Sequence, residues 1–379
     1  MEPLRSQRAL FDIPDGLTYL NCAYMGPLSR PVLEAGREGV ERKRRPWTIG
    51  PADFFEPLEE ARDLFARLID ADTDGVAVLP SVSYGIAVAA RNLPMGAGQR
   101  ILTLADEFPS NVYAWRELAA RASGEVVAVA RPATGDWTAA VIEYIDERTA
   151  IVAVPNCHWT DGGLLDLVRV GERVRDAGAA LVVDGVQSIG AMPLDVAQIR
   201  PDFVMTSLYK WLLGPYSAGF MWCAPERREG RPIEFSWMSR RESDDFARLV
   251  DYQDAYRPGA RRYDVGESSN FALMPAIIAA LKQTIGWGVE RIAAYIAALT
   301  EKTASLAQAH GLGVAPAGLR APHLLGVRLH GADPEVVAKA MAQAEVFVSV
   351  RGDAVRVAPH VYNEPGDIDR LFEVLGATL

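Results

Sequence analysis

The feature that most constrains this fold is a regular alternation of short apolar runs with segments of helical periodicity, from about residue 15 to residue 260. The apolar runs cover residues 76–79, 101–104, 126–129, 151–154, 181–183, 203–205 and 220–222. Helical segments between them include residues 84–93, 110–122, 137–147 and 167–177. Strands that alternate with helices predict βαβ units, and unbroken apolar strands predict a sheet covered on both faces. We therefore predict an α/β fold with a mostly parallel, seven-stranded sheet.

The pattern changes after Arg257-Pro258-Gly259. An alanine-rich helix is predicted from about residue 275 to 311, with an interruption near Gly286 to Gly288. Strand-like runs at 323–329, 346–350 and 355–358 then alternate with helical segments at 334–344 and 365–375. We predict an N-terminal arm (1–20), a large domain (21–260) and a smaller α+β domain (261–379), with the helix from about 275 lying between the domains.

Charge and composition exclude several classes of partner. The 39 basic and 49 acidic residues give a net charge of -10, which disfavours binding to nucleic acid or to an anionic membrane. The three cysteines and five histidines lack the spacing of a disulfide framework or a metal site. The N-terminus has no apolar signal core, and no run approaches the ~20 apolar residues of a membrane span. We expect a cytoplasmic protein without a metal.

An acid and a lysine follow two of the apolar runs directly. Asp184 ends the run at 181–183, and Lys210 comes shortly after the run at 203–205. In open α/β sheets, ligands bind at the carboxyl ends of the strands. Pyridoxal phosphate (PLP) requires an acid for its pyridine nitrogen and a lysine that forms an imine with it. The pair therefore predicts a PLP site. We expect Lys210 to move the α-proton of the substrate as well, because desolvation lowers the pKa of its amine.

Other polar and aromatic residues near the predicted strand ends are candidates for the same site. The amide of Gln187 can donate to the cofactor ring oxygen, or it can form a turn hydrogen bond. The turn that contains Val82 and Ser83 offers backbone amides and hydroxyls to a phosphate, although any serine that caps a helix produces a similar pattern. Ser207 is a second candidate for the phosphate, and Phe108 either stacks on the pyridine ring or belongs to the core.

Together, these motifs resemble the class V aminotransferase group of fold-type I PLP enzymes, in the branch of cysteine desulfurases, selenocysteine lyase, kynureninase and isopenicillin N epimerase. Asp184-Gly-Val-Gln187 resembles the family's Asp-x-x-Gln, and Ser207-Leu-Tyr209-Lys210 resembles its Ser-x-His-Lys. The resemblance implies that Asp184 binds the pyridine nitrogen, Gln187 the ring hydroxyl and Ser207 the phosphate.

The resemblance also implies roles for residues elsewhere in the chain. It places Ser83 on the phosphate, Phe108 on the ring and Asn111 near the cofactor. It implies a homodimer in which Ser268 or Ser269 reaches the phosphate of the other subunit. The substrate candidates are Asn21 and Tyr24 in the opening motif, Arg356 as the carboxylate clamp and Arg351 as a secondary candidate. Either His158 or Trp159 contacts the ring oxygen or the substrate.

The resemblance implies an enzyme that removes the α-proton of an amino acid, either a transaminase or a lyase. The alternative enzymes are a kynureninase-like hydrolase and an isopenicillin N epimerase-like epimerase. The alternative without catalysis is a protein of this fold that binds PLP but does not turn over a substrate. Residues 319–356 contain no cysteine, although desulfurases of this branch carry a nucleophilic cysteine there. A persulfide-forming desulfurase is therefore disfavoured.

Overall fold

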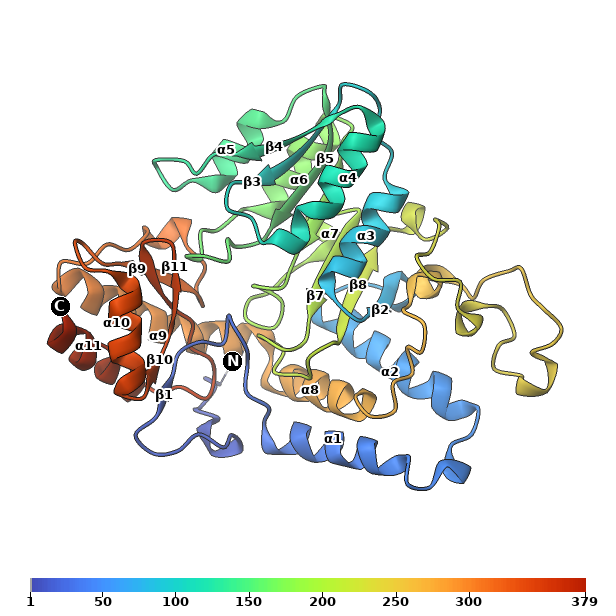
Figure 1. The fold of residues 1–379 in the computed structure, drawn as a ribbon, viewed down its shortest axis with the longest axis horizontal. Helices are drawn as coiled ribbons and strands as arrows, with labels where there is room; N and C mark the ends of the chain where they lie inside the picture. The colour runs from blue at the N-terminus through green and yellow to red at the C-terminus, as the bar shows by residue number, and fades with distance from the viewer. Residues whose placement is uncertain (1) are drawn as a thin grey trace.

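The computed structural model describes residues 2–379, and a seven-stranded sheet forms its centre (Figure 1). The strand order is β2-β8-β7-β6-β5-β3-β4, and β8 runs in the opposite direction to the other six strands. The prediction of a mostly parallel, seven-stranded sheet is confirmed. The strands are β2 (Val76–Leu79), β3 (Arg100–Leu104), β4 (Glu125–Val129), β5 (Thr149–Pro155), β6 (Ala180–Asp184), β7 (Phe203–Ser207) and β8 (Gly219–Cys223).

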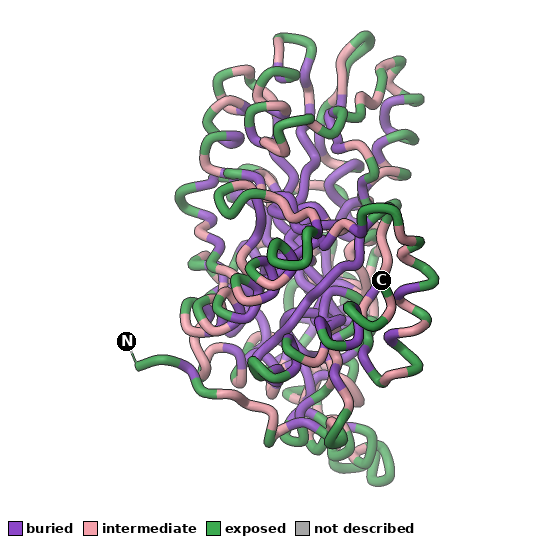
Figure 2. The backbone as a smooth tube through the Cα atoms, turned by 90° about the vertical axis from the view of Figure 1, so that its left-hand side faces the viewer, coloured by how far each residue is buried: buried purple, intermediate pink, exposed green. Residues whose placement is uncertain are grey.

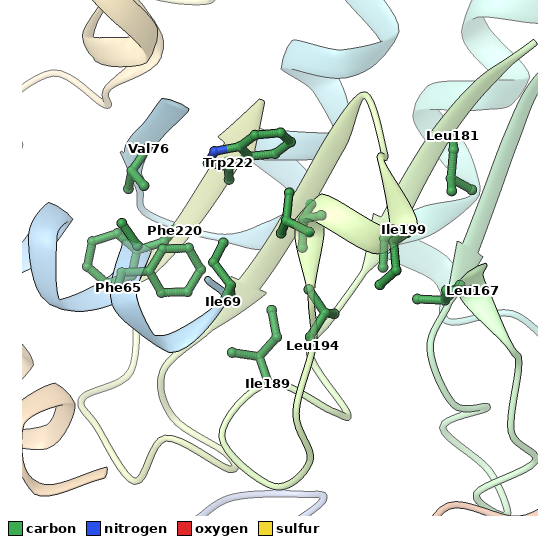
Figure 3. Packing of buried hydrophobic residues seen from close by; sticks show 14 of the residues in the cluster. Phe65, Ile69, Val76, Leu167, Leu181, Ile189, Leu194, Ile199, Phe220 and Trp222 are labelled. Atoms are coloured by element: carbon green, nitrogen blue, oxygen red, sulfur yellow. The ribbon is translucent and has the colours of Figure 1, made fainter. Parts of the chain in front are cut away.

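Helices cover both faces of this sheet, because alternate strand residues point to opposite sides. One core packs α2 (Ala52–Leu68), α5 (Trp137–Tyr144) and α6 (Leu167–Asp176) against one face, where Phe65 and Phe220 stack with ring centroids 4.7 Å apart (Figure 3). The other core packs α3 (Val82–Asn92) and α4 (Tyr113–Ala122) against the opposite face. Figure 2 shows the resulting band of buried backbone through the middle of the molecule.

The predicted alanine-rich helix is two helices that meet at Gly288, whose φ of +81° is a left-handed value that suits glycine. Helix α8 (Met274–Trp287) packs against α1 (Arg30–Arg42) and α2, whereas α9 (Val289–Ala309) packs against the C-terminal helix α11 (Pro365–Thr378). The change of partners at Gly288 places α8 with the large sheet and α9 with the C-terminal elements. The division of the chain at residues 20 and 260 remains a prediction.

The C-terminal part contains a three-stranded antiparallel sheet in the order β11-β12-β9. Its strands are β9 (Leu325–Arg328), β11 (Ser349–Arg351) and β12 (Ala354–Val357), and α10 (Pro334–Gln343) packs against them. The single strand predicted at 346–350 is instead two strands. Its first residues form β10 (Val346–Phe347), which pairs with β1 (Thr18–Tyr19) rather than with β12.

The N-terminal segment therefore connects the two parts of the molecule. After β1, Asn21 forms a bridge to Ala358, and the amide of Gly26 donates to the carbonyl oxygen of Tyr209 at 2.8 Å. A Cβ atom at Gly26 would overlap the carbonyl oxygen of Lys210. The segment thus lies directly against the loop that carries Lys210.

Among residues 2–379, no helix is both long and apolar enough to cross a bilayer. The same residues contain no cluster of three or more His, Cys, Asp or Glu side chains arranged to hold a metal ion. Between strands β6 and β7, the chain also forms the short helix α7 (Val196–Ile199).

Candidate active site

A cavity of about 350 Å³ lies at the carboxyl ends of strands β2, β3, β5, β6 and β7. The loops that leave parallel strands converge at this edge, where open α/β sheets bind ligands. Eight of the predicted cofactor-binding residues line the cavity. They are Val82, Ser83, Phe108, Trp159, Asp184, Gln187, Ser207 and Lys210.

Lys210 is the one buried lysine among the five in the sequence, with 6% of its surface exposed. It lies three residues beyond the end of β7. Burial is the main cause that lowers the pKa of Lys210 to about 8, and the charge of Arg356 acts in the same direction. The charge of Asp184 opposes this shift. A larger fraction of the amine is therefore unprotonated near neutral pH than at an exposed lysine.

Asp184 is the last residue of β6 and is 7% exposed. Burial raises the pKa of Asp184, and a hydrogen bond from the Val186 amide (2.9 Å) and the charge of Lys210 oppose that rise. A buried carboxylate with few donors favours a cationic ligand group. Asp184 thus has the environment that suits a partner for a protonated ring nitrogen.

The orientation of the Gln187 amide is fixed by a neighbour that can only donate. The indole Nε1 of Trp211 donates to Oε1 of Gln187 at 2.9 Å, and Nε2 of Gln187 donates to the carbonyl oxygen of Ala23 at 3.1 Å. An indole N–H cannot accept, so the amide oxygen must face Trp211. The amide nitrogen keeps a second hydrogen, which is the donor predicted for the ring oxygen of the cofactor.

Serine hydroxyls and the start of helix α3 line the cavity. Ser81 caps α3 by accepting a hydrogen bond from the Tyr84 amide (3.3 Å), and its Oγ lies 2.9 Å from Oγ of Ser83. The Oγ of Ser207 is buried and has no hydrogen-bond partner within residues 2–379. Amides and a positive dipole at a helix start bind anions, so the start of α3 is suited to a phosphate.

Two aromatic rings form one wall of the cavity. Phe108 and Trp159 meet edge to face, with centroids 5.5 Å apart and planes at 83°. The indole Nε1 of Trp159 donates to the carbonyl oxygen of Asp106 at 2.7 Å. Nζ of Lys210 lies 5.5 Å from the centroid of the Phe108 ring. Phe108 therefore faces the space beside Lys210, where the predicted stacking would occur.

His158 and Asn111 do not line the cavity. The Nε2 of His158 lies 3.0 Å from the carbonyl oxygen of Ala105, its Nδ1 lies 2.7 Å from Oγ1 of Thr160, and its ring stacks on Trp137. Burial lowers the pKa of His158. Asn111 is fully buried, and its Oδ1 accepts from Nε1 of Trp115 at 3.0 Å. Of the two open candidates at 158 and 159, Trp159 is the one that faces the cavity.

The predicted substrate residues lie beside the cavity, on the side of the C-terminal sheet. Arg356 is 1% exposed, and its Nη1 donates to the carbonyl oxygen of Trp159 at 2.7 Å. The guanidinium of Arg351 lies 5.3 Å from the centroid of the Trp159 ring. Asn21 is buried and accepts a hydrogen bond from Oγ of Ser349 at 2.7 Å, whereas Tyr24 is 56% exposed.

Ser268 and Ser269 are not brought to this cavity. Both are buried, and the Oγ of each lies within 4.0 Å of the sulfur of Met238. Their predicted role concerns the site of a second subunit, so their distance from the cavity of their own chain does not test it.

Among the residues that the sequence-based prediction omits, Glu107 and Trp211 matter most for the chemistry of the site. Glu107 lines the cavity and is 9% exposed. The rule that identified Asp184 also applies to it, because it closely follows the apolar run at 101–104. Trp211 orients Gln187, and no sequence signal identifies that contact, since it depends on the path of two loops.

A family model supplies the first comparison. The model described as "Aminotransferase class-V" matches residues 51–368 of this chain.

The chain is also similar to individual proteins over much or all of its length. The chain is 26% identical to an uncharacterized aminotransferase of Bacillus subtilis (strain 168), over 100% of this chain and 99% of that protein. It is 31% identical to isopenicillin N epimerase of Streptomyces clavuligerus, over 58% of this chain and 56% of the epimerase. Among solved structures, a variant of a cystine C–S lyase with glycine covalently linked to its PLP cofactor superposes with a TM-score of 0.86. That match has 18% identity and covers 98% of this chain and 100% of the other.

Proposed function

This chain belongs to the aminotransferase class-V family, and from that membership we propose that it is a PLP-dependent enzyme that removes the α-proton of an amino acid. The observation that carries the proposal is Lys210, a buried lysine with a lowered pKa that shares one cavity with Asp184. The reaction would be a transamination or a lyase reaction. The absence of a cysteine from residues 319–356 argues against a persulfide-forming desulfurase.

The residues around the cavity fit PLP. Ser207 has a buried hydroxyl without a partner among the described residues, and it lines the same cavity as the start of α3. Gln187 has a free amide hydrogen and Asp184 a buried carboxylate, and both line the same cavity. These donors and acceptors match a phosphate, a ring hydroxyl and a pyridine nitrogen, respectively.

When bound, PLP supplies an electron sink that stabilises the carbanion of an amino acid. Asp184 would hold a protonated ring nitrogen, and Gln187 would donate to the ring oxygen. Arg356 would bind the substrate carboxylate through Nε and Nη2, which have no partner within residues 2–379. Lys210 would accept the α-proton, because its lowered pKa leaves part of the amine unprotonated near neutral pH.

We propose that the enzyme is a homodimer in which Ser268 or Ser269 of one subunit serves the phosphate site of the other. The proposal rests on the resemblance of residues 266–270 to the family loop that reaches the phosphate of the other subunit.

The test is to identify the lysine that binds the cofactor. Purified protein supplied with PLP should absorb at ~420 nm, the band expected of a PLP–lysine imine. Borohydride reduction followed by peptide mass mapping should then locate the pyridoxyl group on Lys210 rather than on any of the other four lysines. Lys210→Ala should lose the band and the turnover of amino acids, whereas the exposed Lys339→Ala, as the matched control, should keep both.

Amino-acid turnover retained by a folded Lys210→Ala protein would contradict this mechanism. Attachment of the pyridoxyl group to a different lysine would equally exclude Lys210 as the residue that binds the cofactor.

A further inference from the structure

Two arginines lie on the same face of the C-terminal hairpin, next to the cavity wall. Strands β11 and β12 pair so that Ser349 is opposite Arg356 and Arg351 is opposite Ala354. Opposed residues of an antiparallel pair point to the same side, and so do residues two apart on one strand. Arg351 and Arg356 are therefore diagonal neighbours, at a spacing of about 7–8 Å between such positions.

Trp159 contacts both arginines and connects them to the cavity. Arg356 donates to its carbonyl oxygen, and Arg351 lies over its ring. The indole is itself held by its hydrogen bond to Asp106. Both guanidinium groups also act electrostatically on Lys210, since the charges of Arg356 and Arg351 each lower its pKa.

Neither arginine has an acidic partner within residues 2–379. Nε and Nη2 of Arg356 and Nε of Arg351 are buried without hydrogen-bond partners. Burial, followed by the charge of Arg351, lowers the pKa of Arg356, and the groups that oppose this shift are thiols and a phenol rather than carboxylates. The buried Arg356 and the half-buried Arg351 thus lie next to each other without an acidic partner among residues 2–379.

Apart from Arg356, the fully buried arginines among residues 2–379 are Arg62 and Arg320, and both are paired with acids. Nη1 of Arg62 donates to Oδ1 of Asp264 at 3.0 Å, and Nη2 of Arg320 donates to Oε1 of Glu301 at 2.7 Å. Burying a charge without a partner is costly, so the exception at Arg356, with the half-buried Arg351 as its diagonal neighbour, indicates a region suited to anions from outside the chain.

We propose that the substrate is an amino acid with a second anionic group, whose α-carboxylate binds Arg356 and whose side-chain carboxylate, or a similar compact oxyanion, binds Arg351. This inference rests on the proposed function, because it takes Arg356 as the α-carboxylate site. The adjacent Nε and Nη2 of Arg356 present the parallel pair of N–H donors that engages both oxygens of one carboxylate. Arg351 then remains available for a second anion, because no acid of the described residues pairs with it.

The test uses dicarboxylates that cannot react. Calorimetric titration of the PLP-loaded protein should show that succinate binds more tightly than butyrate, which has a similar chain and only one carboxylate. Arg351→Met should reduce the ratio of the butyrate Kd to the succinate Kd by about 10- to 100-fold, the usual effect of losing a charge-assisted contact. Arg351→Lys, which keeps the charge, should retain part of the preference. The surface variant Arg370→Met is the matched control and should retain all of it.

Kinetics provide a second measurement. The wild-type protein should have lower KM values for aspartate or glutamate than for asparagine, glutamine or alanine, and Arg351→Met should narrow that difference. A succinate affinity no higher than that of butyrate would overturn the proposal. An equal loss of both affinities in Arg351→Met would also overturn it, because both arginines would then serve one carboxylate.

The Lys210→Ala protein separates this inference from the proposed function. It keeps both arginines, and its preference for succinate can be measured without turnover. A preserved preference together with retained amino-acid turnover would contradict the role of Lys210 and leave the anion site standing. If succinate is not preferred over butyrate, but the wild-type protein shows a normal imine band, the anion site is contradicted. The role of Lys210 then stands.

Discussion

At the scale of single residues, the cavity contains two neighbouring acids in an apolar environment. Oε1 of Glu107 accepts from the Phe108 amide at 2.7 Å, whereas Oε2 is buried without a partner among residues 2–379. Burial, and then the charge of Asp184, raises the pKa of Glu107 from 4.5 to about 8. The Asn111 amide acts in the opposite direction, although the two side chains do not complete a hydrogen bond. Near neutral pH, Glu107 therefore favours its protonated form.

This raised pKa predicts how stability depends on pH. The folded state of the cofactor-free protein holds the Glu107 proton more tightly than the unfolded state does, so the contribution of Glu107 is fully present below pH 4.5 and is lost as pH rises to about 8. Glu107→Gln should remove this loss and raise the melting temperature at pH 8.5 more than at pH 5. In a domain of roughly 200 residues, each kcal/mol gained in the free energy of unfolding raises the melting temperature by about 2–4 °C.

Thermal melts at the two pH values measure this effect, with the exposed Glu147→Gln as the control. Equal shifts of Glu107→Gln at both pH values would show that Glu107 does not retain its proton in the folded protein.

At the scale of elements, strand β2 forms one edge of the large sheet, and a buried ion pair covers it. Nη1 of Arg62, on α2, donates to the carbonyl oxygen of Val76 at 2.6 Å. The Val78 amide donates to Oδ1 of Asp264 at 2.9 Å, and Arg62 also donates to that carboxylate. An open strand edge invites pairing with other chains, so the pair both fixes α2 on the sheet and closes its edge.

Breaking this ion pair should destabilise the fold. Arg62→Met leaves the Asp264 carboxylate buried without its cation, and removing one partner of a buried pair costs about 3–5 kcal/mol. The loss should be smaller at acidic pH, because Asp264 can then be protonated. Urea unfolding at pH 7 and pH 5 measures both effects, and Arg37→Met, which breaks an exposed pair with Glu34, should cost less than about 1 kcal/mol. A cost for Arg62→Met as small as that of the control would refute this role.

At the scale of the whole molecule, the N-terminal segment holds the C-terminal sheet and the Lys210 loop together. Its strand β1 pairs with β10, and its Gly26 packs on the backbone of Lys210 so closely that a side chain has no room. The position of the reactive lysine therefore depends on a segment that is remote from it in the sequence.

Gly26→Ala should disturb the site without removing any side chain from it. The added Cβ must displace the carbonyl oxygen of Lys210 or a methyl group of Leu213, so we expect weaker PLP binding and a weaker imine band. Gly36→Ala is the control, because its Cβ would make only an ordinary contact with Ala276. Spectrophotometric PLP titration of both variants measures the effect. Identical PLP affinities would show that the segment does not position Lys210.

The sequence predicted the parts of this molecule that depend on local patterns. The strand at Val76–Leu79 has the predicted bounds, and the interruption of the alanine-rich helix is at Gly288, because apolar runs and glycines act locally. Local patterns do not predict contacts between segments that are far apart in the sequence. The strand at 346–350 is divided because β1 takes its first residues, and the choice between His158 and Trp159 depends on how one loop turns against Ala105 and Asp106. The unpaired state of Arg351 and Arg356 likewise depends on every segment around them.

The pairing of β1 with β10 also affects the order in which the protein can be made. Thr18 leaves the ribosome early, but its partner Val346 is synthesised near the end of the chain. At about 5–20 residues per second, the N-terminal segment waits roughly 15 to 65 s for that partner. The large sheet can form during this interval, whereas the support behind Lys210 is completed only after the last strands emerge. A nascent chain therefore acquires its sheet first and its finished lysine site last.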